Sequence, residues 1–278
     1  MKKVLAVSGG VDSMVLLEMF RDDPDAVVAH FNHGTRPSAD DDQAFVEAAA
    51  KKYGKPFFTK KENLGADVSE SHARERRYAF LFDVATKNDG VIYTAHHLND
   101  LAESVVINLT RGTGWRGLAP FSSDQKIAHP FLENSPLSKS DILKYAAEHN
   151  VHYREDPTNH EDSYLRNRIR EKFAELELEQ KQTILETTYK LWTRQREIKT
   201  EAETIENEYI KYTNGIYQRD FFKNLDEKTA LELLKAITGE TEPTNKRFLD
   251  AIINFAPEKT FNLPKDKYVT IHKTYFKF

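Results

Sequence analysis

Short apolar runs alternate with longer amphipathic stretches over the first 110 residues of the chain. Uninterrupted apolar runs bounded by turns are typical of buried parallel strands, and apolar residues three or four apart indicate helices. Strands are expected at 4–7, 25–31, 55–59 and 91–95, and helices at 13–20, from a capped start at Ser38 onward, at 71–86 and at 99–109. This alternation predicts an α/β fold with a doubly wound parallel sheet.

The second half of the chain has a different pattern. A further helix is expected at 138–148 with Ser138 as its cap, and residues 173–212 read as one long amphipathic helix or a helix pair. Its apolar stripe consists of Leu191, Ile198, Ala202, Ile205, Tyr209 and Tyr212. Residues 214–278 mix short helical and strand patterns, which predicts a small α+β domain. We therefore expect a sheet domain at 1–172, a long helical linker at 173–213 and a C-terminal domain at 214–278.

A stripe of this length has to be covered by other apolar groups. Either the C-terminal domain or a second subunit can cover it, and the pattern slightly favours a homodimer.

Polar side chains follow three of the expected strands at the point where each strand ends. They lie in the segments 8–12, 30–33 and 96–100. Ligands of doubly wound sheets bind beyond the carboxyl ends of the strands. The three segments therefore predict one shared active site.

The first of these segments has the composition of a phosphate-binding loop. In Ser8-Gly9-Gly10-Val11-Asp12-Ser13, the glycines allow a close backbone approach and the following helix start favours an anion. Ser8 and Ser13 add hydroxyl groups, and Asp12 can hold the Mg²⁺ that accompanies a polyphosphate. Neither the GxxxxGK[ST] nor the GxGxxG pattern is present. A nucleotide phosphate site is expected, although Ser-Gly-Gly alone also occurs in ordinary turns.

Composition and charge exclude several classes of site. The chain has no cysteine, which excludes disulfides, zinc–thiolate sites, iron–sulfur clusters and a cysteine nucleophile. Its formal net charge of −4 means that nucleic-acid binding must rely on local basic patches. The apolar run after the basic residues 1–3 ends at Ser8 and is too short for a signal peptide, and no stretch is long enough to cross a membrane. We expect a soluble, cytoplasmic protein.

The loop resembles the SGGxDS pyrophosphate loop of the PP-loop ATP pyrophosphatases, which have a Rossmann-like fold. Further motifs, in their order and spacing, resemble those of the tRNA(Ile)-lysidine synthetase family. They are His30-Phe31-Asn32-His33-Gly34-Thr35-Arg36, Ala73-Arg74-Glu75-Arg76-Arg77-Tyr78, the segment 95–103, Arg111-Gly112-Thr113-Gly114, and Asp156-Pro157-Thr158-Asn159 with Arg166-Asn167-Arg168. The resemblance covers residues 4–170.

The resemblance implies a specific reaction. ATP adenylates the C2 oxygen of the wobble cytidine in an isoleucine tRNA with a CAU anticodon, and diphosphate is released. The ε-amine of free L-lysine then displaces AMP and forms lysidine. ATP and Mg²⁺ would be the cofactors, and the tRNA and lysine the partners.

The resemblance also implies roles for individual residues. ATP binding would fall to Ser8, Gly9, Gly10, Val11, Asp12, Ser13 and His33, with Asp12 on the metal. Catalysis would involve Asp12, Arg74, Arg77, Asp100 and Glu103. Contacts to the tRNA or adenylate would come from His96, Arg111, Gly112, Thr113, Gly114, Arg166 and Arg168. Asp100 and Glu103, three residues apart on one helix face, suit the lysine ammonium and could accept its proton.

Each of these interpretations has an alternative. The His96, His97 and Asp100 spacing also occurs in zinc sites, and the paired carboxylates could be solvated helix charges. Other functions remain open, namely a thiolating or amidating PP-loop ligase, or a non-catalytic nucleotide-binding module. Two positions depart from the family pattern, because Asn99 replaces the first aspartate of a usual pair and His129 replaces a usual arginine.

Overall fold

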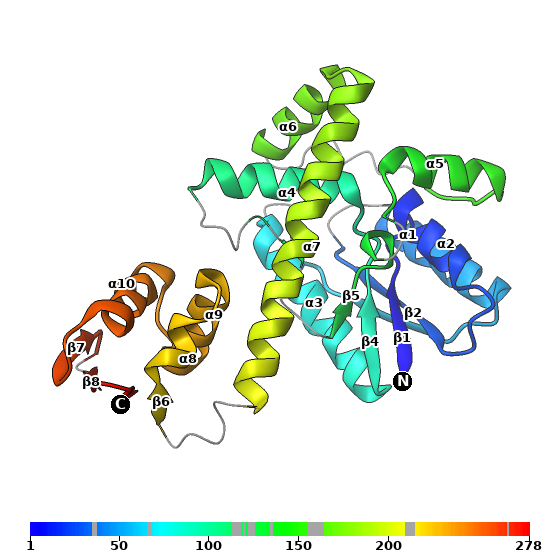
Figure 1. The fold of residues 1–278 in the computed structure, drawn as a ribbon. Helices are drawn as coiled ribbons and strands as arrows, with labels where there is room; N and C mark the ends of the chain where they lie inside the picture. Colours follow the sequence, from blue (N-terminus) through cyan, green and yellow to red (C-terminus); the bar gives the residue numbers. More distant parts are fainter. Residues whose placement is uncertain are drawn as a thin grey trace. The chain divides into compact units, whose positions relative to one another are not determined.

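A five-stranded parallel sheet forms the centre of the N-terminal part (Figure 1). The computed structural model describes residues 1–278 except 35–37, 66–67, 113–117, 119, 122–125, 134–135, 155–163, 209–214 and 266. The strands are β1 (Lys2–Ala6), β2 (Ala26–Asn32), β3 (Phe57–Lys61), β4 (Gly90–Tyr93) and β5 (Ile127–Ala128). Their order in the sheet is β3-β2-β1-β4-β5, so the chain winds outward in both directions from β1.

Helices cover both faces of this sheet. The helices are α1 (Val11–Met19), α2 (Ala39–Lys52), α3 (Glu70–Lys87), α4 (Leu98–Thr110) and α5 (Lys139–Glu148). Because side chains alternate along a strand, Leu5 packs against α1, α2 and α5, whereas Val4 packs against α3 on the opposite face. Every residue of β2 is buried, as is typical of a central parallel strand.

Two further helices follow α5. Helix α6 (Tyr164–Glu175) is short, and α7 (Leu178–Glu208) is the longest of the described part of the chain. Trp192, near the middle of α7, is buried in a cluster with Leu98 and Leu101 of α4. A short 3₁₀ turn, η2 (Pro130–Leu132), contributes Leu132 to the same cluster. This packing fixes the first half of α7 against the helix that follows β4.

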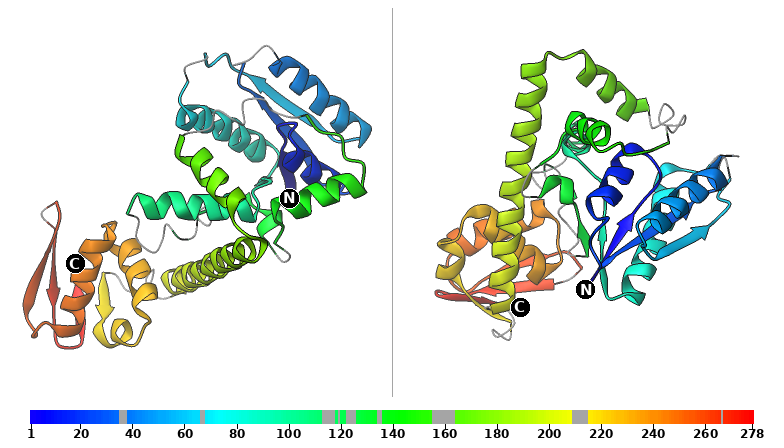
Figure 2. Two further views of the ribbon diagram at one scale, coloured as in Figure 1. Left: turned by 90° about the horizontal axis from the view of Figure 1, so that it is seen from above. Right: turned by 90° about the vertical axis from the view of Figure 1, so that its right-hand side faces the viewer.

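Contact density divides the chain into two compact units, residues 1–192 and 193–278. The second unit contains β6 (Ile216–Gln218), α8 (Arg219–Lys223), α9 (Glu227–Thr238), α10 (Glu242–Asn254), β7 (Lys259–Leu263), β8 (Lys267–Ile271) and β9 (Tyr275–Lys277). Its four strands form an antiparallel sheet in the order β6-β9-β8-β7 (Figure 2). The inward faces of this sheet and of its helices share one core, centred on Phe248 and Phe276.

A buried arginine helps to hold this second unit together. Arg219 has only 4% of its surface exposed. Its guanidinium donates hydrogen bonds to four backbone carbonyl oxygens, three of them at the end of α10 and one at His272, between β8 and β9. The helix end and the strand connection are therefore tied to one side chain.

The predicted fold class is confirmed. Residues 173–208 contain the helix pair that was one of the two expected arrangements, since α6 ends at Glu175 and α7 begins at Leu178. Two local expectations are corrected. Leu191 of the expected stripe is 40% exposed, because the larger Trp192 occupies the buried face. Ser38 precedes α2 without making a side-chain cap hydrogen bond, whereas Ser138 accepts one from the backbone of Asp141, as predicted.

The remaining organisational expectations stay predictions. Tyr209 and Tyr212 of the stripe lie outside the described residues, and the boundaries at 172 and 213 are not tested. In the described part of the chain, every helix is too short or too polar to cross a membrane.

Candidate active site

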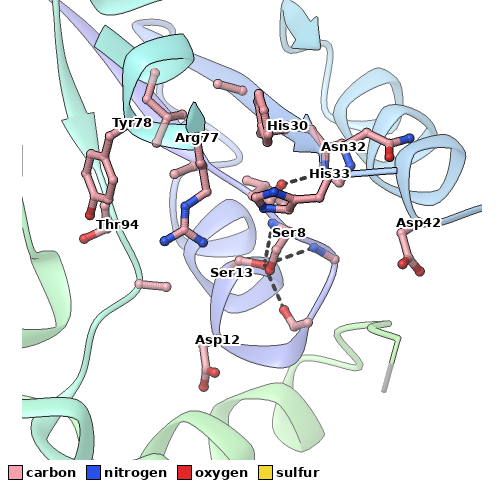
Figure 3. Close-up of a pocket in the computed structure, with 18 of the residues that line it drawn as sticks. Ser8, Asp12, Ser13, His30, Asn32, His33, Asp42, Arg77, Tyr78 and Thr94 are labelled. Atoms are coloured by element: carbon pink, nitrogen blue, oxygen red, sulfur yellow. Dashed lines mark hydrogen bonds between the residues drawn. The ribbon is translucent and has the colours of Figure 1, made fainter. Parts of the chain in front are cut away.

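A cavity of about 470 Å³ opens at the carboxyl ends of β1, β2 and β4. All three polar segments singled out in the sequence contribute to its wall. The lining side chains that carry polar groups are Ser8, Asp12, Ser13, His30, Asn32, His33, Asp42, Arg77, Tyr78 and Thr94 (Figure 3), together with His96, Asp100 and Arg154. The predicted convergence of strand ends at one site is thus seen in the structure.

The hydroxyl of Ser13 holds the loop between β1 and α1 in shape. Ser13 Oγ accepts hydrogen bonds from the backbone N–H of Ser8 at 3.1 Å and of Gly9 at 3.2 Å, and it donates to the carbonyl oxygen of Gly10 at 2.9 Å (Figure 3). The Ser13 side chain is buried, with 6% exposed. The loop therefore has a defined geometry before any ligand binds.

The same loop presents the start of α1 to the cavity. Gly9 has a φ of +100°, a conformation that side chains rarely tolerate, so a glycine is required at the turn. The first N–H groups of a helix have no partner within the helix and carry a partial positive charge. Gly10 is the N-cap of α1, and Val11 to Ser13 form its first turn. This turn is suited to binding an anionic phosphate.

Asp12 lies in that first turn among other charged groups. Its Oδ1 atom is 2.6 Å from Nζ of Lys139 and 3.6 Å from Nε2 of His97. The same His97 nitrogen is 3.5 Å from Oδ2 of Asp100, which also accepts a hydrogen bond from the His97 backbone N–H at 3.0 Å. The Asp12 and Asp100 carboxylates thus flank one imidazole, and both line the cavity.

Helix α3 brings arginine side chains to the opposite wall. Arg77 and Tyr78 line the cavity, and Figure 3 shows the Arg77 guanidinium extending from the helix toward the Ser8–Ser13 loop. Arg74 stacks on the Tyr78 ring, with Cζ 4.7 Å from the ring centre, and donates a hydrogen bond to its hydroxyl. Arg76, by contrast, binds Glu62 through two hydrogen bonds. Within this arginine-rich motif, only Arg77 reaches the cavity directly.

The histidines of β2 have different environments. Nδ1 of His30 donates a hydrogen bond to the Val7 carbonyl oxygen at 2.8 Å, so its proton is on that nitrogen in the neutral ring. Burial lowers the pKa of His30, which keeps the ring neutral near pH 7. His33 follows the strand and packs edge-on against Phe31 while lining the cavity. The contact of His33 with adenine, which the family resemblance implies, stays a prediction.

Thr94 connects two histidines at the end of β4. Its hydroxyl is 2.8 Å from Nδ1 of His96 and 2.7 Å from Nδ1 of His129. Because a hydroxyl has one proton to donate, at least one of the two rings must carry its proton on Nδ1. Burial, and then the neighbouring His129 and arginine cations, hold the pKa of His96 well below its usual range. His96 therefore faces the cavity as a neutral imidazole.

Glu103, one turn beyond Asp100 on α4, contacts helix α6. Its Oε1 accepts a hydrogen bond from Nε of Arg170 at 2.9 Å, and its Oε2 lies 3.9 Å from Nε of Arg166. Burial raises the pKa of the Glu103 carboxyl; the Arg170 hydrogen bond opposes this and the Asp100 charge adds to it. The two carboxylates are thus near one another, but only Asp100 is part of the cavity wall.

Several predicted contact residues lie away from the cavity. Arg111 and Gly112 end helix α4, and Arg168 is on an exposed face of α6. Thr113 and Gly114 lie outside the described residues. The roles assigned to all of these residues remain predictions.

Sequence reasoning missed two cations at the site. Lys139 pairs with Asp12, and Arg154 lines the cavity and binds Asp42 at 2.8 Å between Nε and Oδ1. The backbone N–H of Arg154 also donates to the carbonyl oxygen of Gly9. One signal in the sequence bears on Lys139. The predicted cap at Ser138 places Lys139 at the start of a helix, and helix starts are places where anions bind.

The carboxylates of the site suit a magnesium ion that arrives with its nucleotide. No group of three histidine, aspartate or glutamate side chains is arranged for a metal within the described ranges, which argues against the zinc interpretation there. Mg²⁺ commonly binds one or two carboxylates together with phosphate oxygens and water. Asp12, at the start of α1 beside the phosphate-binding turn, fits that requirement.

Comparisons with known proteins agree with this geometry. A family described as the PP-loop domain matches residues 1–177. A solved structure of the U34-tRNA thiolase NcsA from Methanococcus maripaludis, with its [4Fe-4S] cluster, has a TM-score of 0.58 and 19% identity. The match covers 71% of this chain and 73% of that one, and it supports the fold alone.

Curated relatives named tRNA(Ile)-lysidine synthase are more similar in sequence. One from Streptococcus pyogenes is 31% identical over 99% of this chain and 64% of its own length. One from Persephonella marina is 39% identical over 60% of this chain and 39% of its own length. One from Thermus thermophilus is 38% identical over 60% of this chain and 34% of its own length. The chain thus spans between about a third and two thirds of these relatives.

Proposed function

This chain belongs to the PP-loop domain family, and from that membership we propose that it acts as a tRNA(Ile)-lysidine synthetase. The reaction is an ATP-dependent ligation in two steps. ATP first adenylates the C2 oxygen of the wobble cytidine of an isoleucine tRNA, releasing diphosphate. The ε-amine of free lysine then forms a carbon–nitrogen bond at C2, releasing AMP. The relative that matches over 99% of this chain carries that name.

One observation of the structure favours a ligase over a protein that only binds nucleotides. A phosphate-binding turn and a carboxylate that does not belong to it, Asp100, lie in the same cavity. A protein that only binds nucleotides needs the turn but not a second anionic group. A ligase that activates an oxygen with ATP and then adds an amine needs both.

We assign the phosphate end of ATP to the start of α1. The N–H groups of its first turn bind phosphate oxygens, and the guanidinium of Arg77 on the opposite wall neutralises the charge that develops at the α-phosphate. Asp12 holds Mg²⁺, which neutralises charge on the polyphosphate when bound. His33 contacts the adenine.

We assign the amine end to Asp100. A lysine ammonium needs an anionic partner, and it must lose a proton before the nitrogen can attack. Asp100 faces the cavity and can do both, whereas Glu103 adds negative charge from behind it. His96, a neutral ring in the same cavity wall, contacts the tRNA or the adenylate.

The tRNA is the largest substrate and needs a basic surface. Arg166 and Arg168 of α6, with Arg111 and the residues that follow it, are our candidates for phosphate contacts. Recognition of a CAU anticodon and a cytoplasmic location are also parts of the proposal, and they rest on the family. A homodimer is a further part, and it rests on the apolar stripe.

The proposal is tested by lysine incorporation. The chain is incubated with ATP, Mg²⁺, radiolabelled lysine and total bacterial tRNA, and label is counted in precipitated tRNA after mild alkali. Alkali removes lysine esterified to the 3′ end, whereas a carbon–nitrogen bond at a base survives. Alkali-stable label that requires ATP is the expected result.

Two controls make the result specific. Labelled arginine in place of lysine should give no stable label, and the Lys144→Met variant, which changes an exposed side chain of α5, should behave as the unaltered chain. Diphosphate release without any stable label in tRNA would point instead to another PP-loop ligase.

A further inference from the structure

The ion pair between Asp12 and Lys139 joins two parts of the site that are 127 residues apart. Asp12 is in the first turn of α1, and Lys139 is the first residue of α5. The side chain of Asp12 is 33% exposed and that of Lys139 is 37% exposed. The pair is thus partly accessible to solvent, where an ion pair contributes little to stability. The pair is therefore better explained by the function of the site than by stability.

The position of Lys139 is set by the backbone around it. Ser138 caps α5 through a reciprocal pair of hydrogen bonds with Asp141. The backbone N–H of Lys139 donates to Oδ1 of Asn99, at 2.9 Å, in the first turn of α4. Asn99, which departs from the family pattern, thus connects the beginnings of α4 and α5. This connection directs the Lys139 ammonium toward Asp12.

A carboxylate beside a phosphate-binding turn creates an electrostatic problem. The turn attracts an anion, but Asp12 repels it unless a cation neutralises the carboxylate. The groups near the carboxylate are Lys139 at 2.6 Å and His97 at 3.6 Å, and His97 lies equally near Asp100. Lys139 is therefore the cation best placed to neutralise Asp12.

We propose that Lys139 is a positioning residue of the nucleotide site, which neutralises Asp12 so that a polyphosphate can bind before a divalent cation does. Asp12 is among the described residues that line the cavity and Lys139 is not, so the ammonium acts on the ligand through Asp12. This inference rests on the proposed ATP site. When Mg²⁺ is bound at Asp12, the metal supplies the positive charge and the contribution of Lys139 to binding decreases.

The test measures ATP affinity by calorimetry, once with EDTA and once with Mg²⁺. Without metal, Lys139→Met should bind ATP about tenfold more weakly than the unaltered chain, the size expected for one charged contact. With Mg²⁺ the difference should shrink to about twofold or less. Lys139→Arg should keep metal-free affinity, and Lys144→Met on the same helix should have no effect.

The double variant separates this role from a direct contact. If Lys139 acts through Asp12, adding Asp12→Asn to Lys139→Met removes the repulsion and restores metal-free affinity. A double variant as weak as Lys139→Met would overturn the inference, because the lysine would then bind the nucleotide itself.

Two further outcomes are distinguishable. Equal metal-free affinity of Lys139→Met and the unaltered chain, with both folded by thermal melting, would overturn the role of Lys139 and leave the proposed function intact. A failure of the unaltered chain to bind ATP with Mg²⁺ would contradict the proposed function and this inference together.

Discussion

The hydroxyl of Thr94 lies 2.7 Å from Nδ1 of His129, and this contact joins the ends of two neighbouring strands. The backbone N–H of Thr94 also donates to the carbonyl oxygen of Ala128, so side chain and main chain connect the same two strands. His129 is a departure from the family pattern. The ring of His129 is buried, with 4% exposed. It supports the cavity wall through its contact with Thr94, which lines the cavity.

Removing the Thr94 hydroxyl should destabilise the N-terminal unit. Thr94→Val has nearly the same volume but leaves the Nδ1 atoms of His96 and His129 without this partner. A lost buried hydrogen bond of this kind costs about 1–3 kcal/mol, to be measured as the free energy of unfolding in urea. Thr94→Ser keeps the hydroxyl and should lose less than half as much. Equal losses in the two variants would mean that the methyl group contributes as much as the hydroxyl.

Asp12→Ala should stop the first chemical step without unfolding the protein. If Asp12 holds Mg²⁺, its loss should remove about 3 kcal/mol or more of transition-state stabilisation, about a hundredfold in the rate of diphosphate release. Its partly exposed ion pair with Lys139 predicts a stability loss of about 1 kcal/mol or less. Asp22→Ala, at a largely exposed carboxylate, is the matched control. Turnover near the parent rate would exclude a magnesium role for Asp12.

Asp100→Asn and Glu103→Gln should impair lysine transfer more than ATP binding. Both changes keep hydrogen-bond acceptors for His97 and Arg170, but Asp100→Asn removes a negative charge from the cavity wall and Glu103→Gln removes one behind it. Loss of one charged hydrogen bond predicts a tenfold to hundredfold slower transfer in single-turnover assays, about 1.5–3 kcal/mol. Asn99 cannot compensate, because its side-chain oxygen already accepts the Lys139 N–H.

Glu148→Gln, an exposed change on α5, serves as the control for these two variants. If both variants transfer lysine at the parent rate with the same dependence on lysine concentration, the amine binds elsewhere.

The Glu103 carboxyl predicts a pH dependence of stability. Burial raises its pKa in the folded chain above the value of about 4.3 in unfolded chains. Between the two values the folded state holds a proton that the unfolded state has lost, so this contribution to stability is present at low pH and disappears as the pH rises. Glu103→Gln does not titrate. The unfolding free energy of the parent should therefore fall relative to that of the variant between pH 4 and 7.

Urea unfolding at four pH values in that range measures this difference. A difference that stays constant with pH would mean that Glu103 has the same pKa in both states.

Arg219→Met should destabilise the C-terminal unit. The change leaves four backbone carbonyl oxygens without their donor. A loss of about 2–4 kcal/mol is expected, seen as faster hydrogen exchange across residues 215–278. Lys223→Met, at the other end of the same short helix, should leave exchange unchanged. If exchange in Arg219→Met were equal to or slower than exchange in the unaltered chain, a well-packed apolar side chain would stabilise this unit as well as the arginine does.

The strand ends could be found from sequence because buried parallel strands are continuous apolar runs. Three of the four runs in the first hundred residues end in polar groups that line one cavity. The resemblance to the PP-loop family, drawn from the Ser8–Ser13 loop, is confirmed by the family match. The two-residue strand β5 was missed because so short a strand has no period to detect.

Long-range pairs could not be found in this way. Lys139 reaches Asp12 only because α5 packs beside α1, and no local pattern records that packing. The sequence also could not show whether Leu191 or Trp192 is buried. Both residues fit the helical spacing to within one residue, and the surface that packs against the helix determines which of them is buried.

Ser13 occupies, in the free protein, the place of a ligand within its own loop. Its hydroxyl oxygen receives the N–H groups of Ser8 and Gly9, as an anion's oxygen would. The entropy lost in ordering this loop is therefore part of the free energy of folding and does not recur when a nucleotide enters. Ser13 thus couples the stability of the chain to its affinity, and a Ser13→Ala change would weaken ATP binding by requiring the ligand itself to organise the loop.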